Sequence, residues 1–394
     1  MRNIGIVTTW FDRGAAYVSK AYADTLKQEH HVFIYARGGE KSGKDDEYWD
    51  NSYVTWGKKI RNTVPSFVDY ADFMKWIDKN SIEIVFFNEQ QSWDIILKLQ
   101  KSNLILGTYI DYYTAETVPF FSLFDFLICN TKRHYSVFKD FENCFFVPWG
   151  TDTNIYFPKK DFLKDKEQIV FFHSSGMNPN RKGTDIVINA FRKVECKEIK
   201  LIIHSQIPLP KDLMNDIIID KRIELIVGTV KPPGLYHLTD IYLYPTRLDG
   251  IGLTIMEALA SGLPVVTTDN PPMNEFVIQG VNGFLIKVNE FHKRSDNYYW
   301  DESICDIGNL AEIIQKIAYG DVDINKLSEQ SRNYSLDYLN WERNSQKLSG
   351  IFGNIKKKNL KSDSHYKALI YEYSHYPLYF INALMRRLRK RYYI

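Results

Sequence analysis

Cysteine, long apolar runs and charge of a single sign are all scarce in this sequence of 394 residues. Its four cysteines are scattered along the chain, and none has the CxxC spacing of a metal or redox site. We therefore expect no disulfide framework, no metal site and a reducing, cytoplasmic setting. No apolar run approaches the ~20 residues that a membrane-spanning helix needs. The short run Ile4–Val7 is also unlike a signal peptide, and we interpret it as a buried strand.

The net charge of +2 hides an uneven distribution of basic residues. Residues 355–394 hold ten Lys and Arg against two Asp and Glu, which leaves the rest of the chain mildly acidic. Between residues 378 and 391, apolar residues recur at helical spacing beside five Arg and Lys. Such a basic amphipathic helix favours an anionic membrane surface, and the alternative is a helix packed on the protein itself. The basic runs match no nucleic-acid-binding fold, so we expect no nucleic-acid partner.

Short apolar segments alternate with helical patterns along the first part of the chain. This alternation predicts a parallel sheet that helices cover on both faces. The predicted strands are Ile4–Thr8, His31–Tyr35, Ile84–Phe87, Leu104–Tyr109, Phe126–Cys129 and Cys144–Val147, with helices such as Ala16–Gln28 and Phe67–Lys79 between them.

The pattern breaks at Pro148–Asp152 and a charged stretch follows, Lys159–Gln168, where we place a domain boundary. A second α/β pattern then begins. Its predicted strands are Ile169–His173, Ile199–His204, Ile223–Val227, Ile241–Tyr244 and Pro264–Thr268, and helices are expected at Thr184–Lys193 and around Gly234–Leu238.

The most informative segment follows the predicted strand Ile241–Tyr244. A turn carries Asp249 and two glycines, and a helix starts near Leu253 or Thr254 and holds Glu257. A glycine turn that leads into a helix N-terminus binds anions, because unpaired N–H groups and the helix dipole face the ligand. Seven residues separate the two carboxylates, so both can face one molecule that bears phosphates and hydroxyls.

This segment resembles the signature of glycosyltransferase family 4, the retaining sugar transferases of the GT-B fold. That signature is a strand, then Pro-Ser-x-x-Glu-Gly-Phe-Gly-Leu, then Glu-Ala-x-Ala-x-Gly-x-Pro-Val-Val. The matching positions are Pro245, Thr246, Gly250, Gly252, Leu253, Glu257, Ala258, Ala260, Gly262, Pro264, Val265 and Val266. Two positions depart, because Asp249 replaces a glutamate and Ile251 replaces a phenylalanine. The resemblance extends to about residue 353 and is strongest in the second half.

The resemblance implies which residues of the second half bind the donor. Lys182, in Asn180-Arg-Lys-Gly183, matches the lysine that contacts phosphate, and Arg181 would stand in for a family arginine that is absent at Gly176. Such cations would stabilise the charge that grows on a diphosphate leaving group. The alternative is a solvated basic helix start.

Other residues of this half have implied roles as well. Glu257 matches the acceptor for ribose hydroxyls, a task suited to an acceptor-only carboxylate, and Asp249 matches the acid near the donor sugar. The backbone N–H groups of Gly252, Leu253 and Thr254 would face phosphate or ribose. Val230 is either a contact for the nucleotide base or a core valine.

In the first half, two further residues match the family. Gly14 opens a predicted helix after the first strand, where the family brings backbone close to phosphate and acceptor; a plain helix entry is the alternative. Asp111 is kept in Gly107-Thr-Tyr-Ile-Asp111, but Ile110 replaces the family histidine. Asp111 is therefore a candidate site residue or a cap for the next turn. Asp321-Val-Asp323 looks like a metal motif but lies between helices, so we do not interpret it as one.

The expected fold is α/β and GT-B, with two Rossmann-like doubly wound domains that face each other across a cleft. Residues 1–155 would bind the acceptor and 165–335 the donor, 336–353 would be a closing helix, and 354–394 the basic tail. The resemblance implies metal-independent, retaining transfer from a nucleotide diphosphate sugar of the UDP or GDP type to a glycan or lipid-linked acceptor. The setting would be bacterial surface polysaccharide or glycolipid assembly, at the inner face of the cell membrane. A non-catalytic partner subunit and a GT-B epimerase or phosphorylase remain as alternatives.

Overall fold

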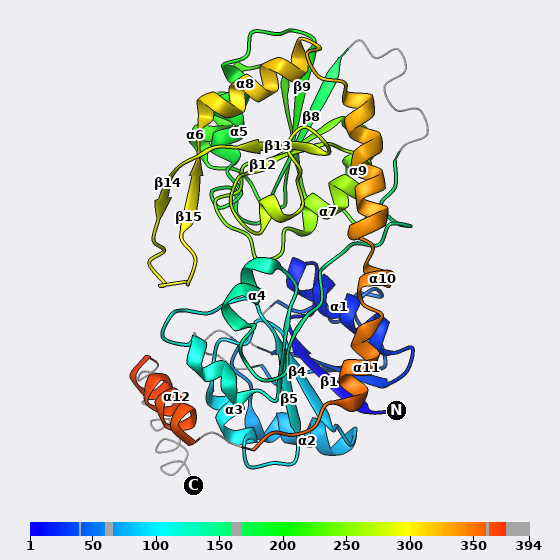
Figure 1. The fold of residues 1–394 in the computed structure, drawn as a ribbon, viewed down its shortest axis with the longest axis vertical. Coiled ribbons are helices and arrows are strands. Elements are labelled where there is room, and N and C mark those ends of the chain that lie inside the picture. The colour runs from blue at the N-terminus through cyan, green and yellow to red at the C-terminus, as the bar shows by residue number, and fades with distance from the viewer. Residues whose placement is uncertain (39–40, 60–65, 159–167, 360–361, 376–394) are drawn as a thin grey trace. The chain divides into compact units, whose positions relative to one another are not determined.

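The computed structural model describes the chain except for residues 39–40, 60–65, 159–167, 360–361 and 376–394. The described chain divides into two compact units (Figure 1). Unit 1 consists of Met1–Asn130, His134–Val147 and Ser345–Ile394, and unit 2 of Thr131–Arg133 and Pro148–Asn344. The division at Pro148 comes earlier than the predicted boundary between residues 155 and 165.

Unit 1 is built on a seven-stranded parallel sheet, and each predicted strand of the first half forms. In sheet order the strands are β3 (Val54–Trp56), β2 (His31–Ala36), β1 (Asn3–Thr8), β4 (Ile84–Phe87), β5 (Ile105–Tyr109), β6 (Phe126–Cys129) and β7 (Cys144–Phe146). The central strands are buried along their whole length, as expected for a sheet covered on both faces. The helices of this part of the chain are α1 (Gly14–Leu26), α2 (Tyr70–Lys79), α3 (Asp94–Leu99), the 3₁₀ turn η1 (Val118–Leu123) and α4 (Lys132–Phe138).

Unit 2 is built on a six-stranded parallel sheet. In sheet order its strands are β10 (Ile223–Val227), β9 (Ile199–Ser205), β8 (Ile169–Gly176), β11 (Ile241–Tyr244), β12 (Val265–Thr268) and β13 (Gly283–Ile286). The chain starts at the central strand β8, winds outward to β10 and then returns to β11 on the other side. This reversal of strand order is the switch point at which α/β sheets bind ligands, beyond the carboxyl ends of the strands.

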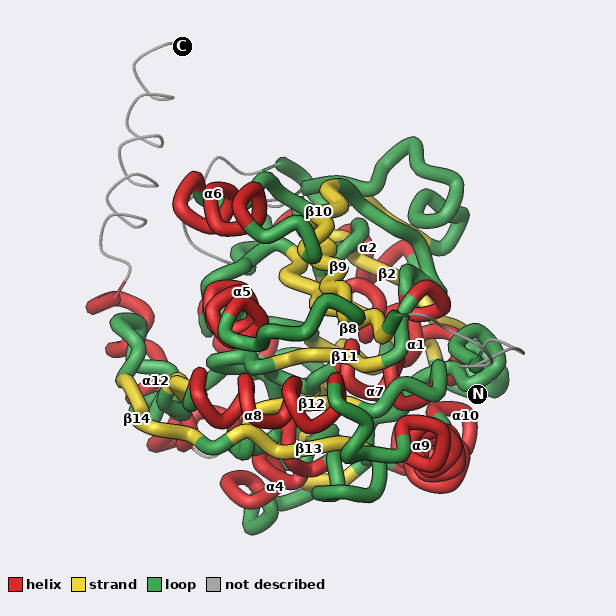
Figure 2. Tube along the Cα trace, turned by 90° about the horizontal axis from the view of Figure 1, so that it is seen from above, coloured by secondary structure: helices red, strands yellow, loops and turns green. Residues whose placement is uncertain are grey.

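Helices cover both faces of this second sheet. Figure 2 shows α5, α6 and α8 on one side of the strands and α7 and α9 on the other. Apolar residues of α5 and α8 pack with the strands in one continuous core. The bounds of these elements are α5 (Thr184–Arg192), α6 (Lys211–Ile219), α7 (Leu253–Ala260), α8 (Ile307–Ala318) and α9 (Ile324–Tyr338), with the 3₁₀ turns η2 (Tyr236–Leu238) and η3 (Met273–Glu275).

A two-stranded antiparallel hairpin lies outside the six-stranded sheet and was not predicted. Its strands are β14 (Val288–His292) and β15 (Glu302–Cys305), and they extend away from the sheet (yellow in Figure 1).

The expected closing helix over residues 336–353 is divided into separate helices. The end of α9 is followed by α10 (Trp341–Asn344) and α11 (Lys347–Asn354), and unit 1 takes up the chain from Ser345. Phe352 of α11 is buried against Phe86 and Phe126, with ring centroids 5.2 and 5.1 Å apart. The C-terminal part of the chain therefore completes the core of unit 1.

Helix α12 (Ser362–His375) is held on unit 1 by a buried carboxylate. Glu372 accepts hydrogen bonds from the Trp93 and Asp94 N–H groups at 3.0 and 3.3 Å and from the Ser92 hydroxyl at 2.5 Å. These N–H groups open α3, where a negative charge is favoured by the helix dipole. Burial raises the pKa of Glu372 from its ordinary value, although these hydrogen bonds oppose the rise.

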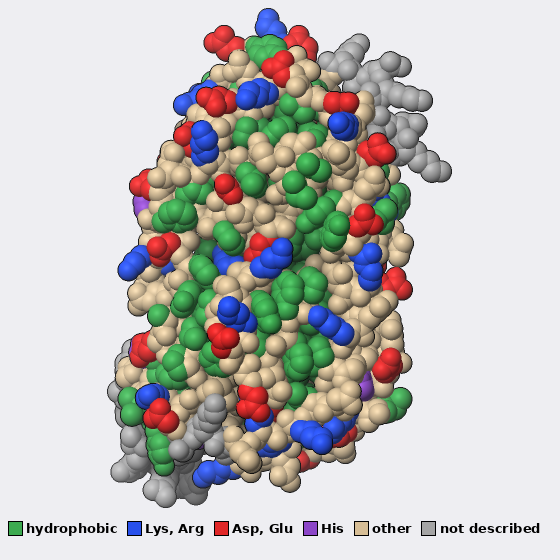
Figure 3. All heavy atoms as spheres, viewed as in Figure 1, with side chains coloured by type: hydrophobic (Ala, Val, Ile, Leu, Met, Phe, Trp, Pro, Cys, Tyr) green, Lys and Arg blue, Asp and Glu red, His purple; other side chains and the backbone are tan. Residues whose placement is uncertain are grey.

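The basic amphipathic pattern of residues 378–391 lies outside the described residues. Among the residues that are described, no helix is long and apolar enough to cross a membrane. Acidic and basic side chains are interspersed over the face drawn in Figure 3 rather than gathered by sign.

Gly183 brings two loops of unit 2 together at the carboxyl edge of the sheet. Its φ of +71° is left-handed, and a Cβ at this position would lie 2.1 Å from the Pro245 carbonyl oxygen. The loop before α5 can therefore lie directly on the loop after β11 only if residue 183 is glycine.

We expect Gly183→Ala to destabilise the protein by about 3 kcal/mol, because strain in the left-handed region adds to overpacking against Pro245. Gly280 is a matched control, because it has the same φ of +71° and a Cβ added there would meet nothing within 4 Å. Gly280→Ala should cost only about 1 kcal/mol. Urea denaturation followed by circular dichroism measures both, and equal losses would disprove the close approach.

Candidate functional site

The centre of the site is a buried ion pair between the two loops that Gly183 joins. Lys182 Nζ lies 2.6 Å from Asp249 Oδ2, and the two side chains are 14% and 15% exposed. The hydroxyl of Tyr244, the last residue of β11, bonds both of these groups. Asp249 Oδ1 accepts from the Gly250 N–H at 2.8 Å, which fixes the carboxylate in the turn. Two predicted site residues are thus in direct contact, and Tyr244 is a third member that the sequence analysis missed.

The protonation states of this cluster follow from its burial and its charges. Burial alone would raise the pKa of Asp249, but the charges of Lys182 and Arg181 and the hydrogen bonds from Lys182 and Tyr244 hold it far below its ordinary value. Burial lowers the pKa of Lys182, and the Asp249 charge opposes this effect. Burial and the Asp249 charge raise the pKa of Tyr244, which remains a neutral donor. The cluster is therefore an ionised pair bridged by a phenol.

Arg181 lies close enough to this pair to act on it electrostatically. Its charge contributes to the lowered pKa of Asp249, and its Nε is buried without a hydrogen-bond partner among the described residues. A buried donor that lacks an acceptor costs free energy unless a ligand supplies one. Arg181 is therefore available to an anionic ligand at this edge.

A second ion pair, not predicted from the sequence, fastens the same two loops. Arg247 donates to both carboxylate oxygens of Asp185, at 2.8 and 2.6 Å, and also to the Asn180 carbonyl. The backbone carbonyl of Arg181 accepts from the Arg247 N–H at 2.8 Å. This bidentate arrangement sets the position of the loop that carries Lys182.

Glu257 is placed on the second turn of α7, beside two tyrosines. Its carboxylate accepts from the Tyr236 hydroxyl at 2.7 Å and also from the Tyr156 hydroxyl. Burial raises its pKa above the ordinary value, although both hydrogen bonds and the Lys182 charge oppose this. The charges of Glu257 and Lys182 each affect the pKa of the other, so the two side chains lie near the same edge of unit 2.

The N-terminus of α7 opens at the same edge. Gly252 precedes the helix with a φ of +82°, and Leu253 and Thr254 are its first residues, as predicted. The first N–H groups of a helix have no acceptor within it, and this helix start directly follows the turn that carries Asp249. Val230, in the loop after β10, is 37% exposed, so it is not a core valine.

The two site residues predicted in the first half belong to unit 1. Gly14 is the first residue of α1, and Asp111 follows β5 in a loop and is partly exposed. Ile110, which replaces the family histidine, is fully buried and contributes to the core of unit 1.

Asp323 is the N-cap of α9, and the Asp323 side chain accepts from the Lys326 N–H at 3.0 Å. Its place in the sequence is therefore explained by helix capping.

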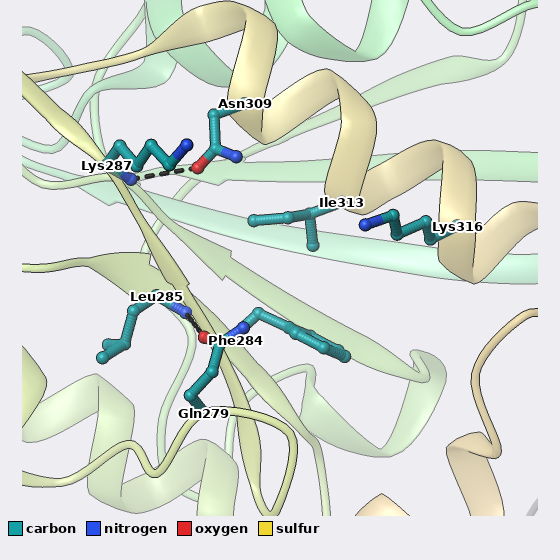
Figure 4. Close-up of a pocket in the computed structure, with 7 residues that line it drawn as sticks. All are labelled: Gln279, Phe284, Leu285, Lys287, Asn309, Ile313 and Lys316. Carbon is teal, nitrogen blue, oxygen red and sulfur yellow. Dashed lines mark hydrogen bonds between the residues drawn. The ribbon is translucent and has the colours of Figure 1, made fainter.

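A small hollow of about 180 Å³ lies elsewhere on unit 2, between the edge strand β13 and α8 (Figure 4). The Gln279 side chain accepts from the Leu285 N–H at 2.7 Å, and that of Asn309 accepts from the Lys287 N–H at 3.0 Å. These amides satisfy N–H groups that the last strand of a sheet leaves unpaired. None of the predicted site residues lines this hollow, which we interpret as a closure of the sheet edge.

Comparison with known proteins agrees with this geometry. The sequence model of the family Glycosyl transferases group 1 matches residues 167–296, which include Lys182, Asp249 and Glu257. The matched residues lie within unit 2. The group 1 match ends within the β14–β15 hairpin, and the strands and helices that hold the buried ion pair lie inside it.

Two named bacterial glycosyltransferases are among the proteins that this chain resembles in sequence. The GtfA subunit of the UDP-N-acetylglucosamine–peptide N-acetylglucosaminyltransferase of Streptococcus pneumoniae is 24% identical over 281 residues, which are 64% of this chain and 53% of the relative. The mannosyltransferase LpsB of lipopolysaccharide core biosynthesis in Rhizobium meliloti is 44% identical over 48 residues, 12% of this chain and 14% of the relative. The chain thus spans about half the length of these relatives or less.

Solved structures show that the fold is GT-B, with two Rossmann-like parallel-sheet units. Anabaena Alr3699/HepE, in complex with UDP and glucose, aligns with a TM-score of 0.69 at 16% identity, over 90% of this chain and 100% of that one. The expected α/β fold class is confirmed.

We expect Tyr244→Phe to lower the free energy of unfolding by about 1–2 kcal/mol, because it removes the hydroxyl that bonds both Lys182 and Asp249. Tyr242→Phe is the matched control. Tyr242 lies two residues earlier on β11 and stacks on Tyr244, with ring centroids 5.4 Å apart. The Tyr242 hydroxyl bonds neither member of the ion pair. Tyr242→Phe should lower the free energy of unfolding by less than about 0.5 kcal/mol. Chemical denaturation at pH 7 compares the two, and a larger loss for Tyr242→Phe would contradict the bridging role.

Proposed function

We propose that the protein is a retaining, metal-independent glycosyltransferase that uses a nucleotide diphosphate sugar. The observation that supports this most strongly is the convergence of Lys182, Arg181, Asp249 and the N-terminus of α7 at one sheet edge, with Glu257 beside them. Such a set offers cations and N–H donors to a diphosphate and a carboxylate to ribose hydroxyls. The name of the GtfA relative, which specifies UDP-N-acetylglucosamine, and the solved structure with UDP and glucose favour a UDP sugar.

In the proposed reaction, the bond from the sugar's anomeric carbon to the diphosphate oxygen breaks, and a bond from an acceptor hydroxyl oxygen to that carbon forms. The acceptor proton passes to the leaving phosphate. Lys182, Arg181 and the α7 N–H groups stabilise the negative charge that develops on the leaving group, so these positive groups take the part that a metal ion has in other transferases. Val230 would contact the base, and Gly14 and Asp111 of unit 1 are proposed for the acceptor side.

The proposed acceptor is a glycan or a lipid-linked glycan of the bacterial surface, and the proposed setting is the cytoplasm or the inner face of the cell membrane. The lipopolysaccharide enzyme among the relatives supports a surface glycan.

Thermal shift with UDP, GDP, ADP and their common sugars tests the donor site first. Stabilisation by one nucleotide, followed by its release from the matching sugar donor when acceptor is added, would support transfer. Binding without turnover would indicate a partner subunit, and isomerisation without acceptor an epimerase.

Lys182→Ala is expected to weaken binding of UDP by about 10- to 100-fold but binding of uridine little, because the diphosphate is the part of UDP that the ammonium would contact. The substitution also leaves Asp249 without its ion pair, so Asp249→Asn is added to it in a second variant. Isothermal titration with both ligands measures the difference. Equal losses for UDP and uridine, in both variants, would disprove the phosphate assignment.

Uridine should bind more weakly as the pH is lowered through the pKa of Glu257. Burial raises this pKa above 4.5, the ordinary value for a glutamate. Ribose hydroxyls donate to the ionised carboxylate, so the affinity is full above this pKa and falls as the pH drops through it. Uridine is used because it has no phosphate that titrates in this range. Glu257→Gln should bind more weakly and without this pH dependence; the same pH profile in both proteins would exclude Glu257 as the ribose acceptor.

A further inference from the structure

The β14–β15 hairpin begins at the sheet edge that carries the proposed donor site. It leaves the carboxyl end of β13, and the loops that hold Lys182 and Asp249 follow the carboxyl ends of β8 and β11 in the same parallel sheet. Carboxyl ends of parallel strands share one edge, so the hairpin arises beside the loops that bind the ligand. The family match ends inside the hairpin, at residue 296.

Hydrogen bonds fasten the hairpin to this edge at Ser303. The Ser303 N–H donates to the Arg247 carbonyl at 2.8 Å, and its hydroxyl accepts from Asn270 at 2.8 Å. Arg247 is the residue that clamps the Lys182 loop through Asp185. The Cys305 thiol also lies 3.2 Å from the Thr268 hydroxyl, at the end of β12. The base of the hairpin is therefore fixed to the loops of the donor site.

The hairpin presents aromatic rings to solvent. Phe291 is 54% exposed and Tyr299 is 41% exposed, although each would be more stable buried in a core. Phe291 pairs directly with Ser303 in the antiparallel ladder, so the two side chains leave the same face of the hairpin. This is the face from which Ser303 reaches Asn270 at the carboxyl edge.

The charged side chains of the hairpin carry both signs. Glu290 pairs with His292 at 3.0 Å, and Arg294 pairs with Asp296 at 2.6 Å. An anionic membrane would require a predominance of basic residues, and a stable protein interface would require a broader apolar patch. Single exposed rings on a hairpin of mixed charge instead suit a sugar, because a pyranose has one face of C–H groups that packs on an aromatic ring and a rim of hydroxyls that bond polar side chains.

We propose that the β14–β15 hairpin is a carbohydrate-binding arm, on which Phe291 and Tyr299 stack on sugar rings of the glycan acceptor. The inference rests on the proposed sugar transfer for its biological role, but binding of a glycan by the hairpin can be measured by itself. The fixed base at Ser303 would hold such an acceptor beside the donor site.

The test compares the full-length wild type with Phe291→Ala and Tyr299→Ala on an array of immobilised oligosaccharides, in the presence of saturating UDP. Each hairpin variant should bind the glycans recognised by the wild type about tenfold more weakly, the loss that corresponds to one aromatic contact. Phe157→Ala is the matched control, because Phe157 is an equally exposed phenylalanine of unit 2, 60% exposed and outside the hairpin. This control should bind as the wild type does.

Thermal stabilisation by UDP should be unchanged in all the variants, which shows that they fold and keep the donor site. Hairpin variants that bind glycans as well as Phe157→Ala would overturn the proposal, and so would a wild type that binds no glycan. Loss of binding to phosphatidylglycerol vesicles in Phe291→Ala, with glycan binding intact, would overturn it in favour of a membrane contact. A wild type that binds glycans through the hairpin but no nucleotide would defeat the proposed sugar transfer and leave the hairpin assignment standing.

Discussion

The candidate site depends on one buried ion pair, that of Lys182 with Asp249. Two opposite charges taken out of water are tolerated only where further hydrogen bonds satisfy them. Tyr244 supplies one of these, and the turn at Gly250 supplies another. The pair in turn requires its two loops to touch, which the absence of a side chain at Gly183 permits. The Lys182 ammonium is thereby held in place by an opposite charge and a hydroxyl.

The topology of unit 2 explains why residues far apart in sequence meet at this pair. The loops after β8 and β11 are separated by more than sixty residues, but the two strands are neighbours in the sheet. Because all strands of the sheet run parallel, the loops that follow them emerge on one edge. Arg247 and Asp185 then fasten the loops, so that the groups proposed to bind phosphate are held in place before any ligand arrives.

Asp249, which departs from the signature that the sequence resembles, has contacts that the sequence did not predict. The aspartate is about one methylene shorter than the glutamate it replaces, and in the structure its carboxylate is directed to Lys182 and Tyr244. Tyr242 and Tyr244 stack on the same face of β11, as alternation along a strand requires. The sequence therefore predicted that Tyr244 ends this strand. It did not predict the contact between Tyr244 and Asp249, because the path of the turn between these residues determines that contact.

The sequence by itself determined the two parallel-sheet units, the start of α7 and the group of Lys182, Asp249 and Glu257, because apolar strand runs, glycine turns and signature spacing are local features of the chain. Only the tertiary structure decided that Ile110 is a core residue, that Val230 is exposed, and that the expected closing helix is divided. It also decided the contacts of Tyr244, Arg247 and Tyr236 and the hairpin fastened at Ser303. These features depend on which loops meet at a sheet edge, and that meeting follows from strand order and packing between distant segments rather than from any local pattern.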